Sequence, residues 1–343
     1  MAVRRGDTIQ FGSGPVLGAW AAVGGKKESR GPLAAGFDAL YGDNALGDAC
    51  WEKAESDLAL AAARTCLKKA QQRPADVDLA LAGDLQAQCT ASGYAMRELG
   101  VPFAGLYGAC STMAEALGLA AALCSAGLCG QALALASSHF CAAERQFRTP
   151  LNYGGKRTPT AQWTATAAGA VLVRAAGRGV PVKAVTFGRV QDYGVRDINN
   201  MGAAMAPAAA ATLLRYFADT HTAPDELDAI FTGDLGLVGS RLLAGLLRAE
   251  GIGLTNHADC GLLLYTPDQN VKAGGSGAGC CAGVLCAHIL PGLAAGRWRR
   301  VLFVATGALM SQTTFLQRES IPAIAHLVEL GAPEPPRKEE APE

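Results

Sequence analysis

Apolar runs broken by short polar turns alternate along the chain between helix-like and strand-like patterns. Two Ala-rich amphipathic segments, 55–70 and 206–218, predict helices, and a short β-like run ending in Gly-Asp-Leu follows each of them. Two longer stretches, 116–143 and 273–296, contain no Asp, Glu, Lys or Arg. Either could span a bilayer by length alone, but internal glycines interrupt both. Each is therefore predicted to contain a helix buried on all faces, with the first running on into a buried strand at 132–136.

The second half of the chain repeats the first. Residues 74–85 match residues 224–235 in one register, with five identities 150 positions apart. These are Pro74/Pro224, Asp78/Asp228, Gly83/Gly233, Asp84/Asp234 and Leu85/Leu235. A later match is offset by 169, which predicts 19 inserted residues between about 235 and 273. The pattern predicts an α/β fold with largely parallel sheets, in which halves 1–177 and 178–330 are related by a pseudo-two-fold axis and a disordered tail follows at 331–343.

Composition narrows the function classes. The chain has 30 Lys and Arg against 30 Asp and Glu, and this balance supports neither non-specific nucleic-acid binding nor a polybasic membrane anchor. The eleven cysteines show no zinc-type spacing, and the first twelve residues contain no apolar signal segment. We therefore expect cytoplasmic synthesis, mostly buried free thiols, and no metal bound by the protein alone.

Cys110 is the strongest candidate for chemistry. Ser111 and Thr112, which are helix-capping types, follow it and lead into an apolar helix. A thiol at a helix N-terminus is favoured as a thiolate and suits acyl transfer, but a buried small residue explains the same pattern equally well. Among five histidines, His139 is the best partner because it ends a predicted buried strand. Nothing in the spacing assembles a Cys–His–Asn set.

Two further segments are candidates for anion binding. The Gly-rich turn 274–279, with Gly275 and Ser276, offers backbone N–H groups before a helix, although close helix packing explains it as well. The loop 144–157 gathers Arg145, Arg148, Lys156 and Arg157 soon after His139. Such cations can bind carboxylates, but each one alone is also an ordinary solvated charge.

These motifs together resemble the thiolase superfamily over about residues 8–330. The resemblance is carried by Gly83-Asp84, Gly108-Ala-Cys-Ser-Thr112, Ala168-Gly-Ala-Val-Leu-Val173 and Ala206-Pro207. It implies a five-layer αβαβα sandwich of two related halves, usually dimeric. The match departs from the condensing enzymes, because no His follows the strand ending at Gly233-Asp234 and no Asn stands in the turn Gly274-Gly-Ser-Gly277. Losing these groups implies a loss of most of the catalytic acceleration.

A narrower resemblance is to the family of stage V sporulation protein AD. It rests on long runs in both halves: Leu106-Tyr-Gly-Ala-Cys-Ser-Thr-Met113, Ser137-Ser-His-Phe140, Ala143-Glu-Arg-Gln-Phe-Arg148, Ala203-Ala-Met-Ala-Pro-Ala-Ala-Ala210, Asp259-Cys-Gly261, Ala273-Gly-Gly-Ser-Gly-Ala-Gly-Cys280, Ala305-Thr-Gly-Ala-Leu309 and Ser320-Ile-Pro-Ala-Ile-Ala-His326. The resemblance implies a non-catalytic protein of endospore-forming bacteria. It implies a peripheral place at the forespore or spore inner membrane, held by integral membrane partners that move dipicolinic acid as its calcium chelate.

The resemblance implies that the thiolase pocket is reused to bind dipicolinate, without another cofactor. The expected ligand residues are Cys110, Ser111, His139, Lys156, Arg157, Asp84, Gly275 and Ser276. If calcium enters with the ligand, Asp84 or Asp234 is expected to supply an oxygen. Two alternatives stay open: an acyltransferase using Cys110 with His139 or His257, and a scaffold with a vestigial pocket.

Overall fold

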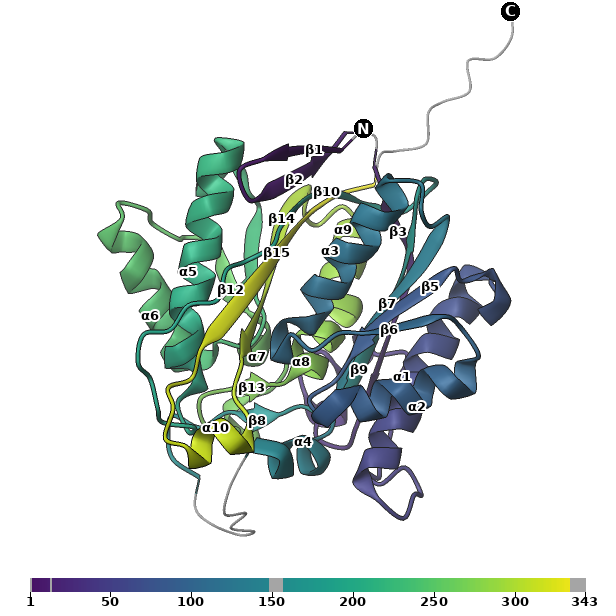
Figure 1. The fold of residues 1–343 in the computed structure, drawn as a ribbon, viewed down its shortest axis with the longest axis horizontal. Helices are drawn as coiled ribbons and strands as arrows, with labels where there is room; N and C mark the ends of the chain where they lie inside the picture. Colours follow the sequence, from purple (N-terminus) through teal and green to yellow (C-terminus); the bar gives the residue numbers. More distant parts are fainter. Residues whose placement is uncertain (1, 13, 148–156, 334–343) are drawn as a thin grey trace, which may run out of the picture.

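The computed structural model describes residues 2–12, 14–147 and 157–333 (Figure 1). The strands are β1 (Ala2–Arg5), β2 (Thr8–Phe11), β3 (Val16–Gly24), β4 (Ala39–Leu40), β5 (Leu79–Gly83), β6 (Phe103–Gly105), β7 (Gln131–Ser138), β8 (Trp163–Thr164), β9 (Ala167–Arg174), β10 (Val180–Thr186), β11 (Ala229–Thr232), β12 (His257–Asp259), β13 (Gly275–Ser276), β14 (Arg300–Ala308) and β15 (Ala323–Gly331). The α-helices are α1 (Trp51–Ala70), α2 (Thr90–Leu99), α3 (Thr112–Ser125), α4 (Phe140–Phe147), α5 (Met201–Thr220), α6 (Gly236–Ala249), α7 (Cys260–Leu263), α8 (Ala278–Val284), α9 (Leu290–Ala294) and α10 (Gln312–Leu316). A π-helical turn, Leu285–Ile289, joins α8 to α9.

The two halves contribute equivalent sets of strands. The main strand order is β12-β11-β14-β15-β10-β3-β9-β7-β5-β6, so five second-half strands meet five first-half strands where β10 pairs with β3. In each set the three outer strands run parallel, because helices connect them, and the next two pairings are antiparallel. The expectation of largely parallel sheets was therefore wrong: β9 and β15 return antiparallel to β7 and β14.

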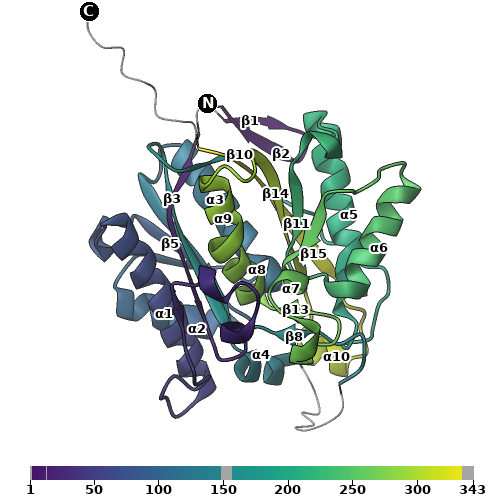
Figure 2. The same ribbon diagram turned by 180° about the vertical axis from the view of Figure 1, so that it is seen from behind.

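Helices form three layers around these strands (Figures 1 and 2). Helices α1 and α2 cover the first-half strands from outside, and α5 and α6 cover the second-half strands. Helices α3 and α8 lie between the two sets and contact strands of the first half, while α3 also contacts β14 and β15. All seven residues of α8 are buried, and α3 is buried around most of its circumference. This confirms both the αβαβα architecture and the two predicted internal helices.

The longest apolar stretches are thus accounted for by the core. Within the described ranges, no helix combines the length and the apolar character that a membrane span requires. Strand β7 continues the first stretch, as predicted from residues 132–136.

The structure also bears on the predicted segment borders. The border at 177/178 lies in the turn between Arg174 of β9 and Val180 of β10. The tail was expected from Gly331, but Gly331 ends β15 and pairs with Arg300 of β14, so it belongs to the sheet. The rest of the predicted tail, from 334, lies outside the described residues. The second copy gains a longer α6 than its counterpart α2, together with the segment that carries α7 and β13.

Candidate functional site

Cys110 lies at the entrance of α3, in a turn held closely against the second half. The turn is the 3-10 segment Ala109–Ser111, and Ala109 has a left-handed φ of 51°. Gly307 of β14 passes so close that a Cβ there would lie 2.3 Å from the carbonyl oxygen of Gly108. The Ser111 hydroxyl donates to that same carbonyl at 2.6 Å, and the Cys110 side chain is almost fully buried. The predicted helix-start position is confirmed, but the turn is packed and its polar groups are occupied.

Asp234 connects this turn to the Gly-rich segment. Its Oδ2 accepts from the Ser276 hydroxyl at 2.8 Å and from the Gly277 N–H at 3.0 Å, while its Oδ1 accepts from the Thr306 hydroxyl at 2.8 Å. The Cys110 side chain lies close enough to this carboxylate for the two groups to affect each other's ionisation. The Asp234 carboxylate therefore joins β13 to β14, and the turn that holds Cys110 packs against this network.

The electrostatics around Cys110 oppose thiolate formation. Burial raises the pKa of the Cys110 thiol well above its usual value, and the nearby Asp234 carboxylate raises that pKa further. Burial also raises the pKa of Asp234 itself. The helix N-terminus does not offset these effects, so the thiol stays protonated and weakly nucleophilic at neutral pH.

The histidines proposed as bases are committed elsewhere. The Nε2–H of His139 donates to the carbonyl oxygen of Asn44 at 2.8 Å, and burial lowers the pKa of this ring. His257 begins β12, where its Nε2 lies 2.8 Å from the Thr232 hydroxyl. That hydroxyl donates to Asp259 at 2.7 Å, so His257 must be the donor to it. Burial lowers the pKa of His257 to about 4.

Asp84 is the first-half counterpart of Asp234 and is equally enclosed. Its oxygens accept from the backbone N–H groups of Gln86 and Ser92, both at 2.8 Å. Burial raises the pKa of Asp84, and its proximity adds to the effect of burial in raising the pKa of Glu55. Calcium needs several free oxygen ligands, and neither Asp84 nor Asp234 offers a free set. Among the described residues, no group of three or more His, Cys, Asp and Glu side chains converges as a metal site.

Free positive charge gathers in a different place, which we call the Trp163 pocket. It is a cavity of about 420 Å³. The lining residues are Lys26, Lys27, Arg30, Asn44, Trp163, Asp268 and Gln269. Lys27 Nζ lies 4.1 Å from the centre of the Trp163 ring and donates to the Gln269 carbonyl at 2.8 Å. Phe140 stacks on the same indole at a centroid distance of 3.9 Å, which fixes its orientation.

Cations around this pocket repel one another. Burial lowers the pKa of Lys27, and the nearby Arg157 and Arg30 lower it further. Glu28, the next residue, raises the pKa of Lys27, but its own pKa is raised by burial and its carboxyl is bound by the Tyr265 hydroxyl. An anion in the pocket would relieve this repulsion.

The predicted ligand residues therefore fall into two groups. Cys110 and Ser276 lie beside the enclosed Asp234 carboxylate, Ser111 follows Cys110 in the same turn, and Gly275 precedes Ser276 in β13. Asp84 lies in neither group, in its own turn of the first half. His139 and Arg157 lie beside the Trp163 pocket: His139 through Asn44, and Arg157 through its position 5.3 Å from the Trp163 ring centre. Arg157 also pairs with Glu144 at 3.5 Å. Lys156 lies outside the described residues.

The two groups are mechanically connected. Strand β8, which begins with Trp163, pairs with β13, which holds Gly275 and Ser276. The Gln162 side chain donates to the carbonyl oxygens of Asp234 and Gly275, at 2.6 and 2.9 Å. The sequence reasoning missed Lys26, Lys27 and Trp163. Lys26 and Lys27 come two residues after Gly24, where β3 ends. This pair of lysines at the end of a buried strand was the feature of the sequence that could have indicated the pocket.

The duplicated halves, the helix-start cysteine and the buried central helices define a thiolase-like fold of the condensing-enzyme type. Solved structures agree. The 3-oxoacyl-[acyl-carrier-protein] synthase III from Aquifex aeolicus VF5 superposes with a TM-score of 0.59 over 93% of this chain and 100% of that one, at 13% identity. Cerulenin-bound OleA from Xanthomonas campestris gives a TM-score of 0.59 over 96% and 99%, at 15% identity. At these identities the likeness concerns the fold alone.

The sequence itself places the chain more narrowly. The profile of the family described as "Stage V sporulation protein AD (SpoVAD)" matches residues 5–331. Stage V sporulation protein AD of Bacillus subtilis (strain 168) is 45% identical over 303 residues, which cover 88% of this chain and 90% of the relative. The chain belongs to the stage V sporulation protein AD family, which supports a role in sporulation.

Proposed function

We propose that this chain binds dipicolinate, free or as its calcium chelate, as the peripheral component of a membrane-associated complex that imports it into the forespore. The family supports the sporulation role. The single observation that supports the ligand is the Trp163 pocket, which combines an aromatic wall with excess positive charge. We place the ligand there, with His139 and Arg157 behind the pocket wall.

The chemistry of the pocket suits a small planar dicarboxylate. Dipicolinate is dianionic at neutral pH, and burying a dianion without cations is costly. Lys26, Lys27 and Arg30 supply three cations against the single carboxylate of Asp268. The indole and the ammonium of Lys27 above it offer an aromatic surface and a charge to one ligand. A volume of about 420 Å³ lies within the usual range for small-ligand sites.

The Cys110 turn is a poorer place for the same anion. The side chains that surround it include the carboxylate Asp234, whose acceptor positions are filled. Nearby Glu115 is a second partly buried carboxyl, and its pKa is raised by burial alone. A dianion there would meet negative charge, without a compensating cation among the residues identified at this turn.

The alternative is a Cys110-dependent acyltransferase acting on acyl thioesters. The fold is compatible with it, but the protonated thiol and the hydrogen bonds of His139 and His257 do not favour it.

Two further proposals concern the proteins that this chain binds. We infer membrane attachment through integral membrane partners, and a homodimer formed through the edge of β6. That strand ends the sheet and pairs with β5, and Tyr94, Phe103 and Tyr107 are exposed around it. Sedimentation of wild type and Phe103→Glu tests the dimer; a monomeric wild type at micromolar concentration would refute it.

Calorimetric titration with dipicolinate, with and without calcium, tests the ligand. Wild type is expected to bind in the micromolar range or tighter. The Lys27→Gln/Arg30→Gln double variant should bind at least tenfold more weakly, which corresponds to about 1.4 kcal/mol. Lys68→Gln, an exposed lysine on α1, is the control and should bind as wild type does.

Two further arms separate the alternatives. Cys110→Ala should keep its affinity within about threefold if the ligand lies in the Trp163 pocket. A loss confined to Cys110→Ala would move the ligand to the Cys110 turn. An absence of dipicolinate heat, together with mass-detected acylation of Cys110 by an acyl-CoA, would restore the enzyme.

A further inference from the structure

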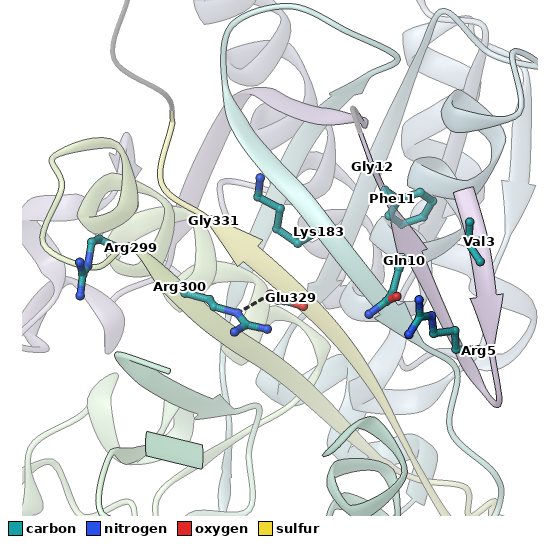
Figure 3. A pocket seen from close by; sticks show the side chains of 10 residues that line it. All are labelled: Val3, Arg5, Gln10, Phe11, Gly12, Lys183, Arg299, Arg300, Glu329 and Gly331. Carbon is teal, nitrogen blue, oxygen red and sulfur yellow. Dashed lines mark hydrogen bonds and ion pairs between the residues drawn. The ribbon is translucent and has the colours of Figure 1, made fainter. Parts of the chain in front are cut away.

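A second cationic cavity lies at the opposite end of the second-half strands, where the β1–β2 hairpin meets β10, β14 and β15 (Figure 3). Its volume is about 490 Å³. We call it the Arg300 pocket. It shares no lining residue with the Trp163 pocket, and the function proposed above does not use it.

Four cationic side chains from separate segments line this cavity. Arg5 comes from β1, Lys183 from β10, Arg299 from the turn before β14, and Arg300 from β14 itself. The only carboxylate among the lining residues is Glu329, which Arg300 neutralises at 2.6 Å. Arg5, Lys183 and Arg299 are exposed and make no ion pair within the described part of the chain. Positive charges therefore outnumber negative ones by three among the lining residues, while Glu226 and Asp228 lie outside the lining, where Glu226 pairs with Arg300 at 3.9 Å and Asp228 accepts from the Arg299 and Arg300 N–H groups.

The floor of the pocket is held rigidly. The Arg300 guanidinium donates to the Tyr216 hydroxyl at 3.2 Å and to Thr222 Oγ1 at 3.0 Å. Tyr216 is fully buried and itself donates to Glu329 at 2.8 Å. This network ties α5 to β14 and β15, so one guanidinium is pre-organised while the other cations stay free to close on a ligand.

We propose that the Arg300 pocket is a binding site for a phosphate-bearing anion. The three unneutralised cations, from β1, β10 and the turn just before β14, favour a multivalent anion over a single carboxylate. Arginine predominates among them, and its planar fork of donors matches phosphate oxygens. The apolar side chains of Val3 and Phe11 complete the wall and suit the carbon part of an organic phosphate. Both a soluble phosphate ester and a phospholipid headgroup present this chemistry.

Titration with glycerol 3-phosphate at low ionic strength tests the site, and vesicle co-sedimentation identifies the source of the phosphate. Lys183→Gln/Arg299→Gln should weaken glycerol 3-phosphate binding at least tenfold. The control is Arg64→Gln/Lys68→Gln on α1, which removes the same net charge from exposed positions elsewhere and should stay within twofold of wild type. Added salt should weaken wild-type binding.

The vesicle arm compares phosphatidylglycerol with phosphatidylcholine. Binding to phosphatidylglycerol that glycerol 3-phosphate displaces, and that the pocket variant loses, assigns a lipid headgroup. Binding of the soluble ester without vesicle binding assigns a soluble ligand. The proposal is overturned if wild type binds neither, if the control loses affinity equally, or if dipicolinate occupies this pocket with the same sensitivity to Lys183→Gln/Arg299→Gln.

Discussion

Replacing Asp234 by alanine removes the acceptor that joins β13 to β14 beside the Cys110 turn. Three donors then lose their partner: the Ser276 hydroxyl, the Gly277 N–H and the Thr306 hydroxyl. Each orphaned buried donor costs about 1–3 kcal/mol, and the hydroxyls recover part of this by rotating to other acceptors. Alanine also removes the free-energy cost of burying a carboxylate, which is reflected in the raised pKa of Asp234, and this offsets a further part of the lost stability. We expect the free energy of unfolding to fall by about 3–5 kcal/mol.

Asparagine at the same position should be far milder. Its Oδ1 can take the place of the oxygen that accepts from Ser276 and Gly277. Its amide N–H can donate to Thr306, because a hydroxyl both donates and accepts. We expect a loss of about 1 kcal/mol or less for Asp234→Asn.

Urea unfolding at pH 7 measures both variants, with an unchanged denaturant slope as the check that only stability changed. Asp225→Ala removes an exposed carboxylate and should lie within about 0.5 kcal/mol of wild type. The reasoning is refuted if Asp234→Ala is as stable as wild type, or if Asp234→Asn is as damaging as alanine.

Two further predictions concern packing and titration. Gly307→Ala places a Cβ 2.3 Å from a backbone oxygen that cannot move freely, so the free energy of unfolding measured in urea should fall by about 2 kcal/mol or more. The control is Gly245→Ala on α6, where the added Cβ meets open space, and this variant should be as stable as wild type or more stable. Burial lowers the pKa of His326 to about 4 from 6.5, so the folded state binds fewer protons and wild type should lose up to about 3 kcal/mol as pH falls from 6.5 to 4. His326→Gln should lose about that much less in unfolding measured across this range, because the contribution of His257, whose pKa is also lowered to about 4, remains in both proteins. An identical pH profile for the two proteins would contradict the assignment.

Much of the fold was readable from the chain. The matched segments around Gly83-Asp84 and Gly233-Asp234 revealed the duplication, because equivalent strands and helices need equivalent residues. The uncharged stretches gave the central helices, since a helix enclosed by two sheets has no polar face. The antiparallel β9 and β15 were missed, because a buried strand has the same apolar run in either direction.

The site was only partly predictable. The position of Cys110 at a helix start follows from its own neighbours in the chain, and the same neighbours made it the strongest candidate for chemistry. That the Asp234 carboxylate raises the pKa of this thiol depends on the proximity of residues 124 positions apart, which no local pattern reports. The loop 144–157 contributed Arg157 near the expected place, whereas Lys27 reaches the same indole from the other end of the first half.

By itself, the sequence determined the fold class, the family and the list of groups able to do chemistry, since these depend on local pattern and on residues matched along the chain. The tertiary structure decided which of those groups are free. Hydrogen bonds from distant segments occupy Asp234, His139 and His257, bonds from the following turn and helix occupy Asp84, and burial holds Cys110 as a thiol. Folding gathers unneutralised cations into the two pockets where segments far apart in sequence meet at the surface, and charge balance at such a place is a property of three-dimensional packing.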